Sequence, residues 1–361
     1  MKKITSLLLA GCMALSLTAC GSSSAPETTA AAAENQAAET TATAETAKED
    51  ALNIIIACNA TNQEHMYNYG LNEFKRVMEE ISEGSVTVTT HAGTIGTDEA
   101  ELVEKMSLNA ADIIVASPGF MTSTGIPEVD ILSLYYLFDS PESWKECVNG
   151  EFGDKLGDLI NEKSGNQFKI LAYWSSGIRN YYGKKPVTTP ADLNGMTIRC
   201  QSSPAIKEFW ESCNAVPTSV NWNELYQALQ QGVVDSAEND YVSFSQKDHH
   251  KTPNGHYICE TQHTYLTPVL MCRGDWYDGL SDQQKAWLEE AVDAATAVEQ
   301  DCTFAMAGDA KDLVIADGAE VVNFEDMDIE AFKAIAAPIQ DAFAEENNMQ
   351  EYLEMIRSYS K

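Results

Sequence analysis

The sequence lacks the short motifs that mark the common enzyme classes. It has no Gly-x-Ser-x-Gly elbow, no Walker loop, no His-Glu-x-x-His pair and no dinucleotide-binding glycine fingerprint. Basic residues are also scarce, because 23 Lys and Arg stand against 55 Asp and Glu, for a formal net charge of −32. This balance argues against nucleic acid and anionic lipid surfaces as partners. The same balance is compatible with a small anionic solute bound by buried arginines. We expect no cofactor.

Regular metal-binding spacings are missing as well. None of the nine cysteines lies in a Cys-x-x-Cys pair, and Cys12 and Cys20 fall in the N-terminal segment. We interpret the other seven as mostly small buried apolar residues and predict neither a disulfide nor a zinc site. The later histidines offer no pair four residues apart, so we interpret His249 and His250 as solvated loop residues.

The N-terminal segment has the features of a lipoprotein signal. Lys2 and Lys3 precede an apolar stretch at 4–17 that is too short for a stop-transfer helix. The sequence Leu-Thr-Ala-Cys at 17–20 then resembles a bacterial lipobox. We predict a signal over 1–20 and a mature chain lipidated at Cys20, on the extracytoplasmic face of the cell membrane. An ordinary cleaved signal with a chance cysteine is the alternative. Residues 21–50, rich in Ala, Thr and Glu, are predicted to form a flexible tether.

Short apolar runs and helical patterns alternate after the tether. This alternation predicts parallel sheets flanked by helices, and about 310 remaining residues suggest two lobes. A capping box at Ser281 and Gln284 starts a helical pattern that continues to about Ala316, with two helices broken near Gly308 as the alternative. We predict strands at 52–57, 85–90, 112–116, 168–173, 196–199 and 233–235, and helices at 64–81, 97–108, 204–212 and 222–231, the last with Asn221 and Glu224 as a capping box.

Arg199 stands at the end of one predicted strand. An arginine fork at a strand end is a common device for binding a carboxylate in two-point geometry, although a plain surface charge would look the same. In two-lobed α/β proteins, ligands bind where the carboxyl ends of strands face a crevice. Five predicted strand ends carry polar or aromatic candidates for such a crevice: Asn59 and Thr61, Ser117 and Phe120, Arg179, Arg199, and Asn239.

The stretch between Asp192 and Asn239 contains D-L-x-G-x-x-I-R, followed by W-x-E-L-Y-x-A-L-x-x-G-V-V-D-x-x-E-N. This pattern resembles that of one family, the DctP-type solute receptors of TRAP transporters. Further pieces, GTIGTDEAELVEKM, ADIIVASPGF and WYDGLSDQQKAWLEEA, extend the resemblance from about Leu52 towards the C-terminus. The sequence departs from the family pattern at 235–239, where it reads D-S-A-E-N and the family often has D-G-x-E-N.

The resemblance implies a two-lobed periplasmic-binding-protein-like α/β fold with a long helix spanning both lobes. We assign 51–176 and 265–304 to lobe 1, and 177–264 and 305–361 to lobe 2. The implied function is capture of a carboxylate-bearing organic anion and its delivery to TRAP membrane permease subunits, which use an ion gradient. No enzymatic reaction is implied.

The resemblance also assigns roles to single residues. Arg199 corresponds to the arginine that forms a bidentate salt bridge with the solute carboxylate. Arg179 corresponds to a second, supporting arginine, and Asn239 to an amide that binds the same carboxylate. The remaining predicted contacts are an aromatic wall from Trp222 and Tyr241, and polar groups for the distal part of the solute from Asn59, Ser117, Gln63 and His65.

The polar first-lobe candidates are uncharged, which favours hydroxyl groups on the solute. We therefore favour a sugar acid such as a uronate over a dicarboxylate. The alternative function is a lipid-anchored secreted sugar hydrolase, which would place two carboxylates against its substrate. The arginines at the family motif favour the receptor.

Overall fold

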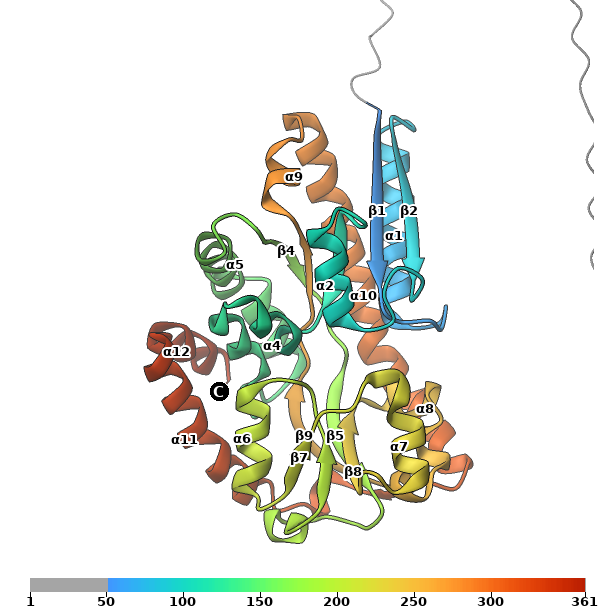
Figure 1. The fold of residues 1–361 in the computed structure, drawn as a ribbon, viewed down its shortest axis with the longest axis vertical. Coiled ribbons are helices and arrows are strands. Elements are labelled where there is room, and N and C mark those ends of the chain that lie inside the picture. The colour runs from blue at the N-terminus through green and yellow to red at the C-terminus, as the bar shows by residue number, and fades with distance from the viewer. Residues whose placement is uncertain (1–50, 361) are drawn as a thin grey trace, which may run out of the picture. The chain divides into compact units, whose positions relative to one another are not determined.

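The computed structural model describes residues 51–360. The predicted signal, Cys20 and the tether therefore lie outside the described residues. Within this part the chain forms a five-stranded and a six-stranded sheet, with α10 running alongside both (Figure 1). No helix of this part is long and apolar enough to cross a membrane.

The first sheet is built mainly from the early strands. Its order is β2-β1-β3-β10-β4, with β1 parallel to both neighbours and β10 antiparallel to both of its own. Continuous apolar runs such as IIVA in β3 suit a sheet covered by helices on both faces. The strands are β1 (Leu52–Cys58), β2 (Val86–Ala92), β3 (Ile113–Ala116), β4 (Lys169–Tyr173) and β10 (Val269–Cys272).

The second sheet has the order β11-β9-β5-β8-β6-β7. Strand β5 is antiparallel to β8 and β9, and the outer pairs are parallel. The strands are β5 (Ile178–Gly183), β6 (Thr197–Arg199), β7 (Val216–Thr218), β8 (Ser236–Asn239), β9 (Tyr257–Tyr265) and β11 (Glu320–Val322).

The prediction of parallel sheets is thus only partly correct. Strands β5 and β10 each follow directly after the chain crosses between the sheets. They are therefore antiparallel to neighbouring strands that enter the same sheet after helices.

The predicted strand 233–235 is wrong. Gly232 ends the preceding helix with φ +72°, the Val233 N–H donates to Ala228 O, and the strand starts only at Ser236. Arg179 lies within β5 rather than after a strand.

Two extended segments, 174–177 and 265–268, connect the sheets side by side. The Trp174 N–H donates to Pro268 O at 2.8 Å, and the Ser176 N–H donates to Leu266 O at 3.0 Å. Gly177 has φ +80°, and a Cβ there would lie 2.9 Å from Asp240 Cβ. A glycine is therefore required where the chain turns into β5.

Helix α10 (Asp282–Ala316) fixes this crossing from one side. It is one continuous helix of 35 residues that packs on α1 and α8, so the prediction of a long helix with a Ser281–Gln284 capping box is confirmed and the alternative break near Gly308 is wrong. The carboxylate of Glu299 accepts the Ser175 N–H at 3.0 Å, and Gln300 Nε2 donates to Tyr173 O at 2.8 Å. The helix thereby holds the connecting segments by hydrogen bonds.

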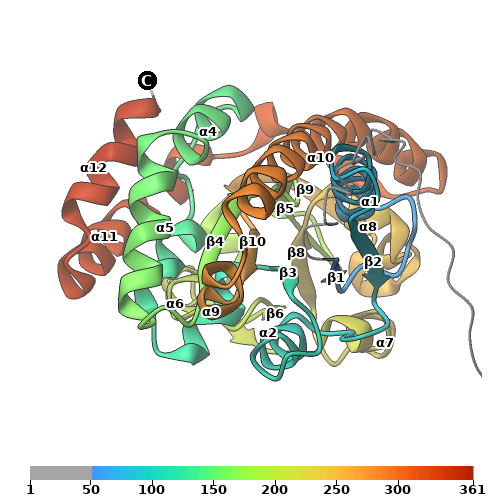
Figure 2. The same cartoon turned by 90° about the horizontal axis from the view of Figure 1, so that it is seen from above.

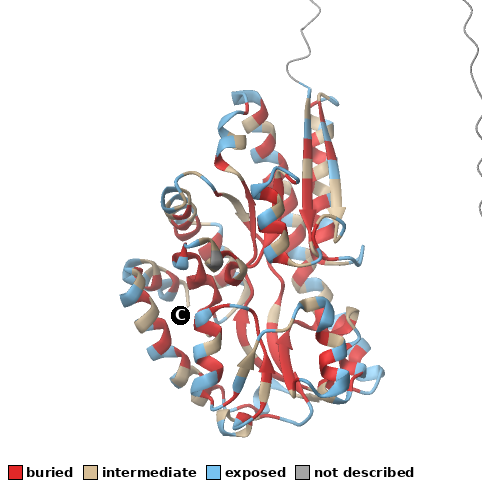
Figure 3. Cartoon of the chain, viewed as in Figure 1, coloured by how far each residue is buried: buried red, intermediate tan, exposed pale blue. Residues whose placement is uncertain are grey.

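The other helices cover the faces of the sheets, and the apolar core lies beneath them (Figure 3). In Figure 2, α1 and α8 lie with α10, whereas α5, α11 and α12 gather at the opposite end of the view. These helices are α1 (Met66–Ile81), α2 (Glu99–Ser107), α3 (Pro118–Met121), α4 (Pro141–Val148), α5 (Glu151–Lys163), α6 (Pro204–Ser212), α7 (Leu225–Gln231), α8 (Tyr241–Gln246), α9 (Gly274–Asp278), α11 (Ile329–Asn347) and α12 (Gln350–Tyr359).

The predicted helix at 222–231 has a different start. Trp222–Glu224 is a single 3₁₀ turn, and the α-helix begins at Leu225. The Asn221 side chain accepts the Asn223 N–H at 3.0 Å, so it caps the turn, but Glu224 is exposed and does not complete a capping box. The seven described cysteines are free. All but Cys302 are buried, which confirms the prediction that most of them are buried.

Candidate functional site

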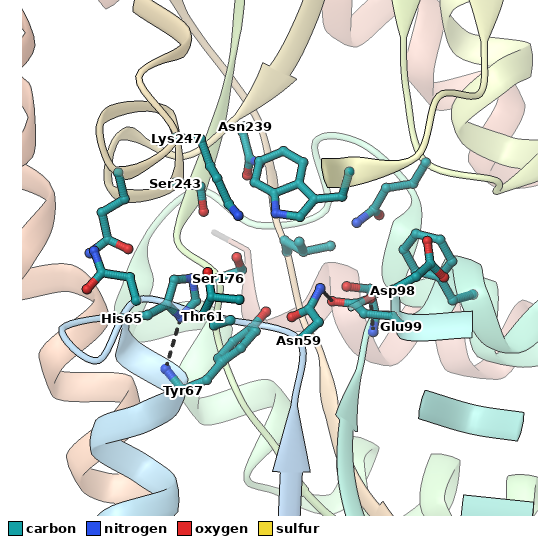
Figure 4. A pocket seen from close by; sticks show the side chains of 18 of the residues that line it. Asn59, Thr61, His65, Tyr67, Asp98, Glu99, Ser176, Asn239, Ser243 and Lys247 are labelled. Carbon is teal, nitrogen blue, oxygen red and sulfur yellow. Dashed lines mark hydrogen bonds between the residues drawn. The ribbon is translucent and has the colours of Figure 1, made fainter. Parts of the chain in front are cut away.

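A cavity of about 90 Å³ lies where strand ends of the two sheets face each other. Asn59, Asp98 and Glu99 enter it from the first-sheet side, and Asn239 and Lys247 from the second-sheet side (Figure 4). The further lining residues are Ala60, Thr61, Asn62, His65, Tyr67, Ser117, Phe120, Ser176, Arg179, Arg199, Gln201, Trp222, Ser243, Gln246 and Leu266.

Arg199 reaches the cavity from the last position of β6. Its side chain is 4% exposed, and Nε donates to Val220 O at 3.0 Å. Its two terminal nitrogens have no hydrogen-bond partner among residues 51–360. Burial lowers the pKa of the guanidinium more than the negative charge of Glu238 raises it. The fork of Arg199 is therefore a buried cation suited to receive an anion from the cavity.

Arg179 lines the same cavity but is already paired. Its Nε forms a buried ion pair with Glu238, and Nη2 donates to the Glu238 carbonyl at 2.7 Å. Burial alone would lower the pKa of Arg179, but the carboxylate of Glu238 raises it. Its Nη1 donates to Asn239 Oδ1 at 2.7 Å, and the Asp240 N–H donates to the same oxygen. This fixes the amide of Asn239 so that Nδ2 is the group left to donate to a ligand.

The first-sheet wall of the cavity is acidic. Glu99, at the first position of α2, is 6% exposed, and it accepts the Ser117 N–H at 2.8 Å and Asn59 Nδ2 at 3.4 Å. Burial raises the pKa of its carboxyl group. Asp98 caps α2 through the Ala100 N–H at 2.8 Å. Carboxylates at this wall accept hydrogen bonds from hydroxyl groups and repel a second carboxylate.

Trp222 lies next to two cations. Arg199 is 5.6 Å and Lys247 5.8 Å from the centre of its ring, so the indole supports the cationic side of the cavity by cation–π contact. Lys247 Nζ is 3.5 Å from Asn223 Oδ1, and burial lowers the pKa of its ammonium group.

His65 is the N-cap of α1, and its Nδ1 accepts the Tyr67 N–H at 3.3 Å. Burial, reinforced by the positive charge of Lys247, lowers the pKa of the imidazole to about 3. His65 is therefore neutral at physiological pH, and its ring contributes a hydrogen-bonding group rather than a charge.

Three hydrogen bonds cross from one side of the cavity mouth to the other. Asn221 Nδ2 donates to Asp98 Oδ2 at 3.1 Å, and Asn223 Nδ2 donates to the Thr97 carbonyl at 2.8 Å. The third joins Gln246 Nε2 to the Glu64 carbonyl at 3.1 Å. The two sides thus touch directly around the cavity.

The structure brings most of the predicted site residues together at this cavity. Two of them lie elsewhere, because Gln63 is exposed outside it and the Tyr241 hydroxyl donates to Glu260 at 2.9 Å, away from its lining. The residues that line it are Arg199, Arg179, Asn239, Trp222, Asn59, Ser117 and His65, with Thr61 and Phe120 from the predicted strand ends.

The interpretation of His249 and His250 as solvated loop residues is wrong. Both are buried in a 3₁₀ turn, where His249 Nδ1 is 2.8 Å from the Tyr182 hydroxyl and His250 Nε2 is 3.1 Å from Asp317 Oδ2. They pack behind Trp222 and against Phe244. Among the described residues, no group of three or more His, Cys, Asp or Glu is arranged to hold a metal ion.

Sequence reasoning missed several lining residues. Asp98 and Glu99 carry a helix-start signal, an N-cap followed by an acidic first turn, that could have placed them at a strand end. Lys247 follows the short helix α8 in a polar stretch of the sequence that carries no binding motif. No local pattern marks Gln201, which reaches the cavity because it lies just after β6.

A sequence profile of bacterial extracellular solute-binding proteins, family 7 (DctP), matches residues 57–347. A solute-binding protein of Chromohalobacter salexigens is 28% identical over 278 residues, which cover 77% of this chain and 80% of the relative. The C4-dicarboxylate-binding periplasmic protein DctP of Rhodobacter capsulatus is 26% identical, over 76% of this chain and 82% of the relative.

Solved structures show the same fold. A TRAP periplasmic solute-binding protein from Sulfitobacter sp. NAS-14.1, with bound β-D-galacturonate, is similar with a TM-score of 0.77 and 25% identity. The similarity covers 85% of this chain and 99% of that one.

Proposed function

The chain belongs to the DctP family of bacterial extracellular solute-binding proteins, and on this basis we propose that its cavity captures a sugar acid, a uronate above all, for a TRAP-type transporter. The observation that carries the proposal is the Arg199 fork, a buried cation whose terminal nitrogens have no partner among the described residues. A carboxylate at this position would accept both N–H groups and compensate the buried charge. Asn239 Nδ2 donates to the same carboxylate.

The first-sheet wall supports a sugar acid over a dicarboxylate. Glu99 and Asp98 would repel a second carboxylate, whereas hydroxyl groups can donate to them. Asn59 and the neutral ring of His65 add further hydrogen-bonding groups. The galacturonate bound by the Sulfitobacter protein is a ligand of this chemical class.

The two cavity carboxylates do not favour a sugar hydrolase. A glycosidase needs an acid and a nucleophile or base that flank the scissile bond. Asp98 and Glu99 are neighbours at the start of one helix and both accept hydrogen bonds from the protein. They form a single wall, so the proposal includes binding and release without a chemical step.

Delivery and location belong to the same proposal. We assign the lobes to 51–176 with 265–304 and to 177–264 with 305–361, and infer that closure on the solute creates the surface that the TRAP permease subunits recognise. Closure selects the liganded state to the extent that the solute contacts both sides. The lipobox at 17–20 supports lipidation at Cys20, which would hold the receptor at the extracytoplasmic face of the membrane.

A thermal-shift screen tests the binding proposal. The protein is heated with uronates, aldonates, dicarboxylates, amino acids and neutral sugars, since a ligand of the native state raises the melting temperature. A rise with uronates supports the proposal, and a response to neutral oligosaccharides alone would contradict it. For the anchor, a Cys20→Ala variant should leave the membrane fraction, and an unchanged distribution would contradict lipidation.

A further inference from the structure

A second cavity, of about 360 Å³, adjoins the first. The two share Asp98, Phe120, Arg199 and Gln201 as lining residues. The second cavity extends between the start of α2 and α3 on one side and the loops after β6 and β7 on the other. The cleft therefore has two adjacent compartments, and the side chain proposed to bind the carboxylate lines both of them.

Gln201 is the clearest sign that a ligand reaches this junction. Its side chain is 7% exposed, and its buried Oε1 accepts no hydrogen bond from any residue in 51–360. A buried amide oxygen without a donor is costly, and native proteins rarely keep one without a reason. A ligand hydroxyl located between the compartments would supply that donor.

The walls of the second cavity indicate what it accepts. Beyond the shared Asp98 and Arg199 its side chains are uncharged. Ser202 and Ser219 provide hydroxyl groups, and Thr122 and Asn221, which already form hydrogen bonds within the protein, lie beside them. The hydroxyls of Ser202 and Ser219 lie 3.4 Å apart at its exposed edge. Neutral hydrogen-bonding groups of this kind suit a polyhydroxyl unit, and no second fork is present for another carboxylate.

We propose that the second cavity is a subsite for a neutral sugar, so that the protein binds a disaccharide in which a uronate is glycosidically joined to a neutral hexose. This inference rests on the proposed binding of a uronate carboxylate at Arg199. The uronate occupies the first cavity, the glycosidic linkage passes Gln201, and the neutral unit lies against Ser202 and Ser219.

Calorimetric titration of the full chain with three probes tests this subsite. Glucuronate and β-glucuronosyl-(1→4)-glucose should both bind, and a glucuronate-(1→4)-glucuronate dimer should bind more weakly than the mixed disaccharide because its second carboxylate meets Asp98 and no free cation. Ser202→Trp and Ser219→Trp fill the compartment from two different loops. Each should weaken the mixed disaccharide by about tenfold or more and change glucuronate by no more than about twofold.

Ser212→Trp is the matched control, because Ser212 is an exposed serine at the far end of the helix that follows Ser202. It should leave both ligands unaffected. Binding of glucuronate without binding of the mixed disaccharide would overturn the subsite and leave the proposed function standing. Binding of neither would overturn both. Equal losses for both ligands in the two filled variants would show that the compartments are not separate.

Discussion

The two walls of the cavity carry opposite charges. The second-sheet wall gathers Arg179, Arg199 and Lys247, whereas the first-sheet wall carries Asp98 and Glu99. Within the cationic wall, Arg179 has a buried carboxylate partner, whereas Arg199 forms no ion pair with any residue in 51–360. A charge that serves the fold is thus paired inside the protein, whereas a charge that serves a ligand is buried with its terminal hydrogen-bonding groups left for that ligand.

The largest expected effect comes from removing the unpaired charge. Arg199→Ala should weaken uronate binding by about 3–6 kcal/mol, a hundredfold or more, because two charge-assisted hydrogen bonds of about 1.5–3 kcal/mol each are lost. The melting temperature without ligand should change little, since the Val220 hydrogen bond and the cation–π contact with Trp222 are lost while a desolvated charge is removed. Calorimetry measures the affinity. Arg76→Ala, on the exposed face of α1, is the control, and equal affinities in both variants would refute the role of Arg199.

Removing the paired charge should act on stability instead. Arg179→Ala leaves the Glu238 carboxylate buried without its cation, so the free energy of unfolding should fall by about 3–5 kcal/mol. Denaturant titration measures this. The double variant Arg179→Met with Glu238→Gln should recover part of the loss, because the uncompensated charge is gone. If Arg179→Ala kept the native stability, the contrast between the two arginines would fail.

The acidic wall should control the choice of ligand. Glu99→Gln should weaken uronate binding by about tenfold, since a charged acceptor for a hydroxyl becomes neutral. The same change should improve succinate binding, because a repulsive charge is removed. The ratio of the two affinities is the quantity to measure. A ratio equal to that of the native protein would show that this wall does not select the solute.

A smaller, pH-dependent effect separates two buried carboxylates. Burial would raise the pKa of Glu238, but the Arg179 cation lowers it below the ordinary value; Glu299 is buried with neutral donors and has its pKa raised well above 4.5. A carboxyl group whose pKa is raised in the folded state, such as that of Glu299, stabilises the fold at low pH. Its contribution to the free energy of unfolding is lost as the pH rises through the folded-state pKa.

The native protein should therefore lose stability relative to Glu299→Gln as pH rises from 4.5. Unfolding of both proteins at several pH values measures the difference. Glu238→Gln should show the opposite sign, because the stability that Glu238 contributes is present above its ordinary pKa and is lost as pH falls. A difference for Glu299→Gln that is independent of pH would contradict the assignment.

Much of this arrangement could be predicted from the sequence. The strand-end rule and the family pattern placed Arg199, Asn239 and Ser117 at one cavity, and the capping box at Ser281 located the long helix. Local patterns could not show that β5 and β10 run antiparallel to their neighbours, because strand direction depends on how the chain crosses between the sheets. Periodicity also misplaced β8, since the apolar residues before it belong to a turn that Gly232 initiates.

The pairing state of each side chain was beyond sequence reasoning. Arg179 and Arg199 look alike in the sequence, and only the tertiary position of Glu238 distinguishes them. His249 and His250 lie in a polar stretch, yet Tyr182, Phe244 and Trp222 bury them from distant segments. Such contacts join residues far apart in the chain and leave no local signal.

The most direct test of the central claim is a calorimetric titration of the native protein and of Arg199→Ala with glucuronate, galacturonate, succinate and glucose. We predict that the native protein binds a uronate more tightly than succinate, does not bind glucose, and loses uronate binding in Arg199→Ala. Tight binding of glucose, or uronate binding that survives in Arg199→Ala, would contradict the account.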